Sequence, residues 1–190
     1  MSELATLGGT YTYLNAYIDL IRQLDRGSFT KRVRAPLLIV EPKKKKKRAS
    51  FAAGATKHAS VDGTDPHGST LPSRLLQQAH ELIVHEIRRK VSEGSGRVML
   101  GRAADCDVVI GDETVSMLQS VFLFDADGRC TIEDMETTNG TLLNGTPLAF
   151  GAPTGLKDGD SLIMGDTRLL FFYPQGLYDL MRALVSDQAG

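Results

Sequence analysis

The chain has 190 residues, 42% of them hydrophobic, and a formal net charge of −1 at neutral pH. This length and apolar share predict one ordinary domain with a buried core and some extensions. No run approaches the roughly 18 apolar residues that a membrane-spanning helix needs, and the N-terminus has no basic segment followed by an apolar run. We therefore expect a cytoplasmic protein without a membrane span.

The charge is distributed unevenly along the chain. Residues 97–173 carry twelve Asp and Glu against five Lys and Arg, whereas residues 31–48 carry nine Lys and Arg against one Glu. This pattern predicts an acidic body with a basic arm. The two cysteines, Cys106 and Cys130, are expected to be reduced thiols, since disulfides are rare inside cells. Cys and His do not cluster at metal-ligand spacing, so we expect no metal and no cofactor.

The first segment, residues 1–42, is predicted to be a helical extension that ends in one strand. Leu14, Ile18 and Ile21 recur at helical spacing within residues 10–25, a short helical turn follows near residue 28, and residues 36–40 form an apolar run typical of a buried strand. Residues 43–72 have almost no large apolar side chain, which predicts a basic, disordered linker.

Residues 73–174 are predicted to form the main domain. A short helix from Ser73 precedes a strand within residues 81–89. Short apolar runs then recur about every ten residues, and Xaa-Gly pairs typical of hairpin turns separate several of them. The expected strands are 97–101, 107–110, 119–124, 129–133, 141–143, 161–164 and 167–173. This pattern predicts an all-β fold, a two-sheet β-sandwich, followed by an amphipathic C-terminal helix in residues 175–190.

Three fragments of the main domain carry the side chains that a phosphate-binding site needs. Gly101 and Arg102 end one predicted strand, Ser116 lies in the next loop, and Thr138 and Asn139 lie in a third loop. A phosphate dianion is bound by guanidinium groups, hydroxyl donors and backbone amides that converge from rigid loops. Loops at one end of a sandwich can supply all of these groups.

In this order the fragments resemble the forkhead-associated (FHA) domain, a β-sandwich that binds phosphothreonine, over about residues 80–173. The resemblance implies that Arg102, Ser116 and Thr138 hold the phosphate and that Asn139 binds the peptide backbone. Gly101 and Gly140 would support the loops, Gly140 in a conformation that a side chain would forbid. The implied partner is a phosphothreonine-containing protein, and a Ser/Thr kinase would act upstream.

Two positions depart from the family pattern. Met117 stands where the family usually has Arg, Lys or Asn, and Gln119 stands where it has His. Methionine has no hydrogen-bond donor for a phosphate. Because such a bond contributes about 1.5–3 kcal/mol, its loss weakens binding roughly ten- to 150-fold. Glutamine both donates and accepts hydrogen bonds, so Gln119 is expected to replace part of the histidine's role in ordering the loops.

Several alternatives stay open at this point. The sandwich can be a degenerate FHA scaffold that binds a protein partner without phosphate. The run Lys43–Arg48 can bind nucleic acid, although no aromatic residues are interleaved with it, or it can rest on the acidic sandwich. A phosphorylated linker threonine, Thr56, Thr64 or Thr70, can dock in the chain's own site. We expect no catalysis, because the sequence lacks a phosphate-cradling loop, a zinc-binding helix motif and a nucleophile elbow.

Overall fold

The computed structural model describes residues 11–41, 71–90 and 96–187. The linker predicted at 43–72 lies almost wholly outside these ranges, as do Lys43–Arg48 and the three linker threonines. In the described parts of the chain, no helix is both long and apolar enough to cross a membrane.

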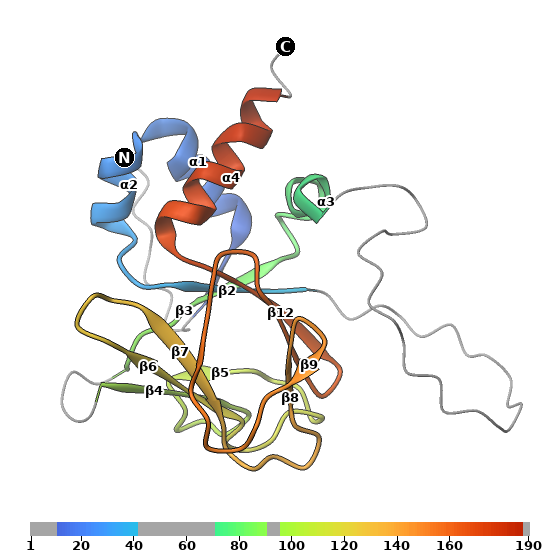
Figure 1. The fold of residues 1–190 in the computed structure, drawn as a ribbon. Helices are drawn as coiled ribbons and strands as arrows, with labels where there is room; N and C mark the ends of the chain where they lie inside the picture. The colour runs from blue at the N-terminus through green and yellow to red at the C-terminus, as the bar shows by residue number, and fades with distance from the viewer. Residues whose placement is uncertain (1–10, 42–70, 91–95, 188–190) are drawn as a thin grey trace, which may run out of the picture.

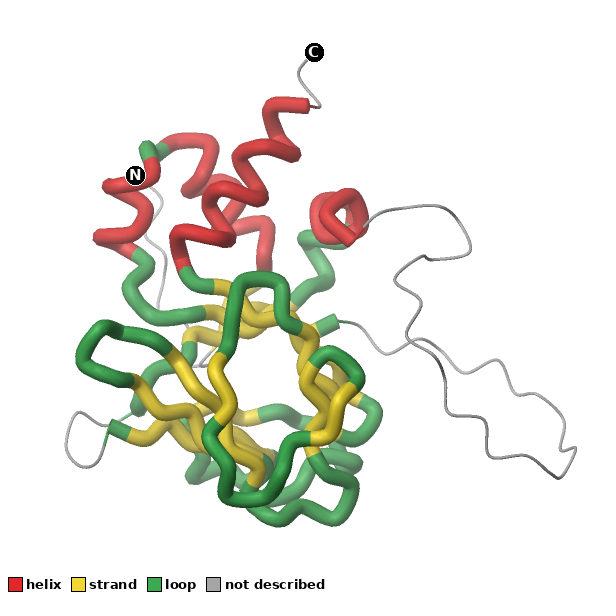
Figure 2. The backbone as a smooth tube through the Cα atoms, in the orientation of Figure 1, coloured by secondary structure: helices red, strands yellow, loops and turns green. Residues whose placement is uncertain are grey.

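The described residues form two β-sheets that pack face to face, with helices on the outer face of one sheet (Figures 1 and 2). The larger sheet has the strand order β1-β3-β2-β12-β11-β8-β9. These strands are β1 (Tyr11–Tyr13), β2 (Leu37–Val40), β3 (Ile83–Glu86), β8 (Thr141–Leu143), β9 (Thr146–Pro147), β11 (Ser161–Met164) and β12 (Thr167–Phe172). All neighbouring strands of this sheet are antiparallel.

The smaller sheet has the order β10-β7-β6-β4-β5. Its strands are β4 (Arg97–Gly101), β5 (Val108–Val109), β6 (Ser120–Phe124), β7 (Cys130–Asp134) and β10 (Thr154–Gly155). Only the β4–β5 pair among them is parallel. The predicted fold class, a two-sheet β-sandwich with flanking helices, is confirmed.

Four helices complete the described structure: α1 (Leu14–Gln23), α2 (Arg26–Arg32), α3 (Leu71–Gln77) and α4 (Pro174–Asp187). Asp25 begins α2, because its side chain accepts a hydrogen bond from the Ser28 backbone nitrogen at 3.0 Å. The helices lie together above β2, β3 and β12 in Figure 1. Contacts join α4 to α1, α2 and α3, so the C-terminal helix lies at the centre of this layer.

Strand β2 is buried on both faces. Leu37 and Ile39 belong to the apolar core beneath the helices, whereas Leu38 belongs to the core between the two sheets. Successive side chains of a strand point to opposite faces, so an uninterrupted apolar run is needed where both faces are covered. The predicted strand at 36–40 is therefore present, and it pairs with both β3 and β12 inside the sheet.

The prediction of one helix from residue 10 was wrong at its start. Tyr11–Tyr13 forms β1, which pairs with β3, and the helix begins at Leu14. The helical spacing of apolar residues begins only at Leu14. No local feature of the residues before it specifies pairing with a strand about 70 residues away. The predicted boundaries at 42/43, 72/73 and 174/175 stay predictions.

Candidate functional site

The predicted site residues lie at one end of the sandwich. Strand β6 runs antiparallel to both β4 and β7. The end of β4, the start of β6 and the end of β7 therefore meet at the same edge. Three loops leave this end of the smaller sheet. The first begins with Arg102 after β4, the second comprises residues 111–119 before β6, and the third comprises residues 135–140 between β7 and β8.

The first contact joins Arg102 to the loop that contains Ser116. The backbone nitrogen of Arg102 donates to the Ser116 carbonyl at 2.9 Å, and its Nε donates to the Val115 carbonyl at 3.2 Å. Gly101 lets this loop approach, since a Cβ at that position would collide with the Met117 carbonyl. The guanidinium of Arg102 is thus held beside Ser116 while the side chain stays exposed.

Gln119 joins the second loop to the third. Its side chain is 1% exposed. Its Oε1 accepts a hydrogen bond from the Ser116 nitrogen at 3.0 Å, and its Nε2 donates to Thr137 Oγ1 at 3.0 Å, Thr141 Oγ1 at 3.0 Å and the Gly140 carbonyl at 3.3 Å. One buried amide therefore sets the position of Ser116 relative to the loop that carries Thr138 and Asn139.

A buried carboxylate completes this network. Asp134 accepts hydrogen bonds from the Thr137 nitrogen at 3.1 Å, from Thr137 Oγ1 at 3.0 Å and from Thr141 Oγ1 at 2.6 Å. Because the single hydroxyl proton of Thr141 goes to Asp134, the Oγ of Ser120 is the donor in its 3.2 Å contact with Thr141. Asp134 was not among the predicted site residues, although Asp is one of the residues that favour turns by bonding to nearby backbone.

The Ser116 loop is also tied to the larger sheet. Buried Asp112 accepts hydrogen bonds from the nitrogen and Oγ1 of Thr114 at 2.9 and 2.8 Å and from Thr167 Oγ1. Gly165, with φ of 58°, lies against Thr114 where a Cβ would collide. Asn139 Nδ2 reaches the Thr114 carbonyl at 3.4 Å, which brings the second and third loops together at the surface.

The resulting surface is open and suited to an oxyanion. Arg102, Thr138 and Asn139 are exposed and Ser116 is half-buried. A guanidinium, two hydroxyls and a side-chain amide can all donate to phosphate oxygens or to a peptide backbone. Gly140 has φ of 69°, as expected of a glycine in this turn. Met117 is 55% exposed and contributes no donor.

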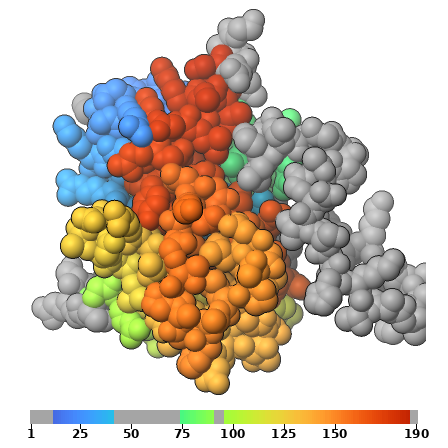
Figure 3. All heavy atoms as spheres, in the orientation of Figure 1, coloured from blue at the N-terminus to red at the C-terminus, as the bar shows by residue number. Residues whose placement is uncertain are grey.

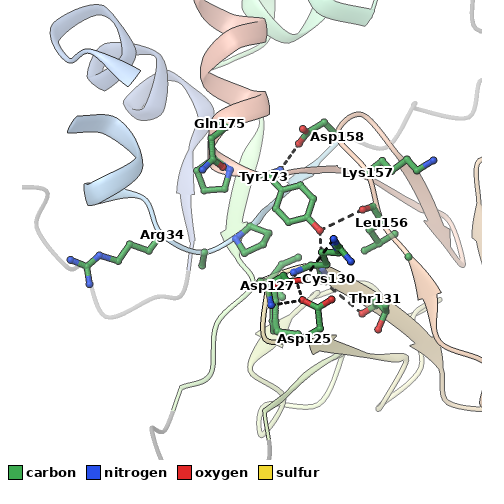
Figure 4. A pocket seen from close by; sticks show the side chains of 18 of the residues that line it. Arg34, Asp125, Asp127, Cys130, Thr131, Leu156, Lys157, Asp158, Tyr173 and Gln175 are labelled. Carbon is green, nitrogen blue, oxygen red and sulfur yellow. Dashed lines mark hydrogen bonds and ion pairs between the residues drawn. The ribbon is translucent and has the colours of Figure 1, made fainter. Parts of the chain in front are cut away.

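A cavity lined by described residues lies elsewhere, between the helical layer and the β6–β7 hairpin (Figure 4). It has a volume of about 900 Å³, and two hydrogen bonds cross its lining. The Tyr173 hydroxyl accepts from the Cys130 nitrogen at 2.8 Å, and Asp158 accepts from the Tyr173 nitrogen at 2.6 Å. Burial raises the pKa of the Asp158 carboxyl. These bonds join the sandwich to α4.

Across the described ranges, no cluster of His, Cys, Asp and Glu could hold a metal ion.

Comparison with known proteins agrees with the resemblance seen in the sequence. Residues 98–165 match the family model of the FHA domain, which confirms the predicted recognition over that stretch. No curated protein matches the chain significantly.

Several solved structures are similar to the chain. One, from a study of phosphothreonine-dependent FHA domain interactions, is 17% identical with a TM-score of 0.43, and the match covers 73% of this chain and 96% of that one. Mycobacterium tuberculosis EmbR, in complex with a low-affinity phosphopeptide, is 25% identical with a TM-score of 0.37. That match covers 40% of this chain and 20% of EmbR. The FHA domain of MEK1, in complex with a phosphothreonine peptide of HOP1, is 28% identical with a TM-score of 0.38. That match covers 47% of this chain and 86% of the MEK1 chain. All three TM-scores are below 0.5, so the family match carries the comparison.

Proposed function

We propose that this chain is a phosphothreonine-dependent protein-binding adaptor that acts downstream of a Ser/Thr kinase. Arg102, Ser116 and Thr138 bind the phosphate of the partner, and Asn139 binds the main chain beside it. The phosphate dianion is attracted by the guanidinium and is fixed by hydroxyl donors on two loops. The protein supplies recognition and no catalysis.

The observation that carries this proposal is the position of Gln119. Its amide spans from the Ser116 nitrogen to Thr137 and Gly140, so the two loops with the proposed phosphate donors are ordered before a ligand arrives. Preorganised donors bind more tightly, because less conformational entropy is lost on association. In this position Gln119 performs the ordering role that the resemblance assigns to a histidine.

The proposal is tested by fluorescence binding of a degenerate phosphothreonine peptide library and of the same library without phosphate. We expect binding that requires the phosphate and is lost in Arg102→Ala. Arg129→Ala is the matched control, because Arg129 is an exposed arginine on the β6–β7 hairpin at the opposite end of the sandwich. Equal binding of the two libraries by the wild-type chain would refute the proposal.

A second candidate is a degenerate scaffold that binds a protein partner without phosphate. Met117 favours it, since an exposed thioether stands where the family supplies a polar group. The two candidates differ in whether the partner must be phosphorylated. Nucleic-acid binding through Lys43–Arg48 is a third hypothesis, and loss of DNA binding on deletion of residues 43–48 would support it.

A further inference from the structure

The tripeptide Asn-Gly-Thr occurs twice in this chain, at residues 139–141 and at residues 144–146. Asn139 belongs to the candidate site, whereas Asn144 lies in the turn between β8 and β9. Both asparagines are exposed, and the segment from β8 to β10 forms much of the orange front face in Figure 3. The two tripeptides therefore share their local chemistry and their access to water. They differ in how the fold holds the asparagine side chain.

An Asn-Gly pair loses ammonia without an enzyme. The backbone nitrogen of the glycine attacks Cγ of the asparagine, and the new C–N bond closes a succinimide ring. The proton of that nitrogen leaves with the side-chain NH2 group as ammonia. Water then opens the ring at either carbonyl, which gives aspartate or isoaspartate. Asparagine is accordingly a thermolabile residue, and a following glycine favours the attack because it has no Cβ and adopts backbone conformations closed to other residues.

The fold holds the side chain of Asn144 with two hydrogen bonds of ordinary length. Its Oδ1 accepts from the Ser161 nitrogen at 2.9 Å, and its Nδ2 donates to Asp160 Oδ1 at 2.8 Å. The Asn144 nitrogen also donates to the Ser161 carbonyl at 2.8 Å. These bonds fix the amide against the start of β11. They oppose the rotation that would bring Cγ of Asn144 onto the Gly145 nitrogen.

The side chain of Asn139 is held less firmly. Its Nδ2 donates to the Thr114 carbonyl at 3.4 Å, longer than the usual range of about 2.7–3.2 Å. Within the described chain its Oδ1 has no hydrogen-bond partner. The attacking group, the Gly140 nitrogen, donates to the Thr137 carbonyl at 3.3 Å, which is also a long bond. Two long hydrogen bonds are therefore the restraint on the reacting groups of this pair.

Deamidation of Asn139 would remove the group that the proposed function assigns to the peptide backbone. An amide both donates and accepts hydrogen bonds, whereas a carboxylate only accepts them. The product also carries a negative charge beside the position of a phosphate dianion, and like charges that share a site disfavour each other. Isoaspartate in addition lengthens the main chain next to Gly140. Either product is therefore unsuited to the ligand.

We propose that Asn139 is a site of spontaneous deamidation and that this reaction switches the phosphothreonine site off. The inference rests on the proposed function. The fold protects Asn144, which has the same local sequence, so the selectivity for Asn139 is a tertiary effect. A bound phosphopeptide engages the amide of Asn139 and slows its loss. Chains that are occupied by a partner therefore keep a working site for longer than empty chains.

The first experiment follows deamidation of the full chain at pH 8 and 37 °C, in buffer and in urea, by mass spectrometry of proteolytic fragments. In buffer we expect Asn139 to convert at least about tenfold faster than Asn144, which must break stronger hydrogen bonds. In urea the fold is absent and the tripeptides are identical, so the two rates should be similar. The tightest-binding phosphothreonine peptide of the library should slow conversion of Asn139 in buffer.

The second experiment measures binding of the phosphorylated and unphosphorylated libraries. Asn139→Asp reproduces one product, and we expect it to bind at least about tenfold more weakly than the wild type. Asn15→Asp adds the same charge at an exposed position of α1 and should bind like the wild type. Aged wild-type chain, separated from unreacted chain by ion exchange, provides a second measurement if the Asn139 variant unfolds.

The outcomes separate this inference from the proposed function. Equal rates at the two asparagines in buffer, faster conversion of Asn144, or the same preference for Asn139 in urea would overturn the inference and leave the function standing. Preferential conversion of Asn139 with unchanged phosphate-dependent binding would overturn the switch. Fresh wild-type chain that binds both libraries equally would overturn the proposed function and the switch together.

Discussion

The backbone carbonyl of Met117 lies so close to the Cα of Gly101 that no side chain fits between them. This contact, together with the hydrogen bond from Ala103 nitrogen to the same carbonyl at 3.0 Å, presses the Ser116 loop onto the end of β4. The absence of a single Cβ therefore determines how near Ser116 comes to Arg102.

Replacement of Gly101 by alanine is expected to displace this loop. The new Cβ meets backbone atoms of Met117 and Leu118, which cannot rotate away as a side chain would. We expect a loss of about 1–3 kcal/mol in the free energy of unfolding and loss of phosphopeptide binding, measured by urea denaturation and fluorescence. Gly155→Ala in β10 is the control, because a Cβ there has no neighbour within 4 Å. Equal stability of the two variants would contradict the packing argument.

Replacement of Gln119 by leucine keeps the approximate size of the side chain and removes its hydrogen bonds. The Ser116 nitrogen and the Gly140 carbonyl lose a partner inside the protein. An unsatisfied buried group costs about 1–3 kcal/mol, so we expect the unfolding free energy to fall by about 2–4 kcal/mol. Gln77→Leu, on an exposed position of α3, should change it by less than about 0.5 kcal/mol. Denaturant titration of both variants measures the difference.

Met117→Arg separates the phosphate-dependent reader from the degenerate scaffold. An added guanidinium beside Ser116 should contribute about 1.5–3 kcal/mol to phosphate binding, which is roughly a ten- to 150-fold gain in affinity. Met99→Arg, on an exposed position of β4, controls for the added charge. Titration with phosphorylated and unphosphorylated peptides measures the effect. A gain that is equal for both peptides, or no gain, would support the scaffold.

Cys130 is expected to make the stability fall at alkaline pH. Burial raises the pKa of its thiol from 9.0 to about 12. The pKa of this thiol is higher in the folded state than in the unfolded state. Its contribution to the free energy of unfolding is therefore complete below pH 9 and is lost as the pH rises toward 12. In that window wild-type stability should decrease more steeply than that of Cys130→Ala, by up to about 1.4 kcal/mol per pH unit. Denaturation at pH 8, 9 and 10 tests this, and parallel slopes would contradict it.

The same burial predicts slow reaction of the thiols. Cys106 and Cys130 are both free and buried, and burial also raises the pKa of Cys106. The thiolate is the reactive species. A disulfide reagent at pH 8 should therefore label both cysteines only as fast as the chain unfolds. Rapid labelling of the native protein would show that either thiol is accessible.

The sequence by itself indicated the sandwich, most of its strands and the three fragments of the candidate site. The prediction of the sandwich was confirmed because apolar alternation and Xaa-Gly turns are local features, whereas the binding role of the three fragments stays a prediction. Only the tertiary structure placed β2 between β3 and β12, since strand pairing across more than 40 residues leaves no local signal. It alone also showed that Gln119 joins two loops and that Asp134 holds one of them. Those relationships depend on which strand ends meet in space, and the order of residues along the chain does not specify that.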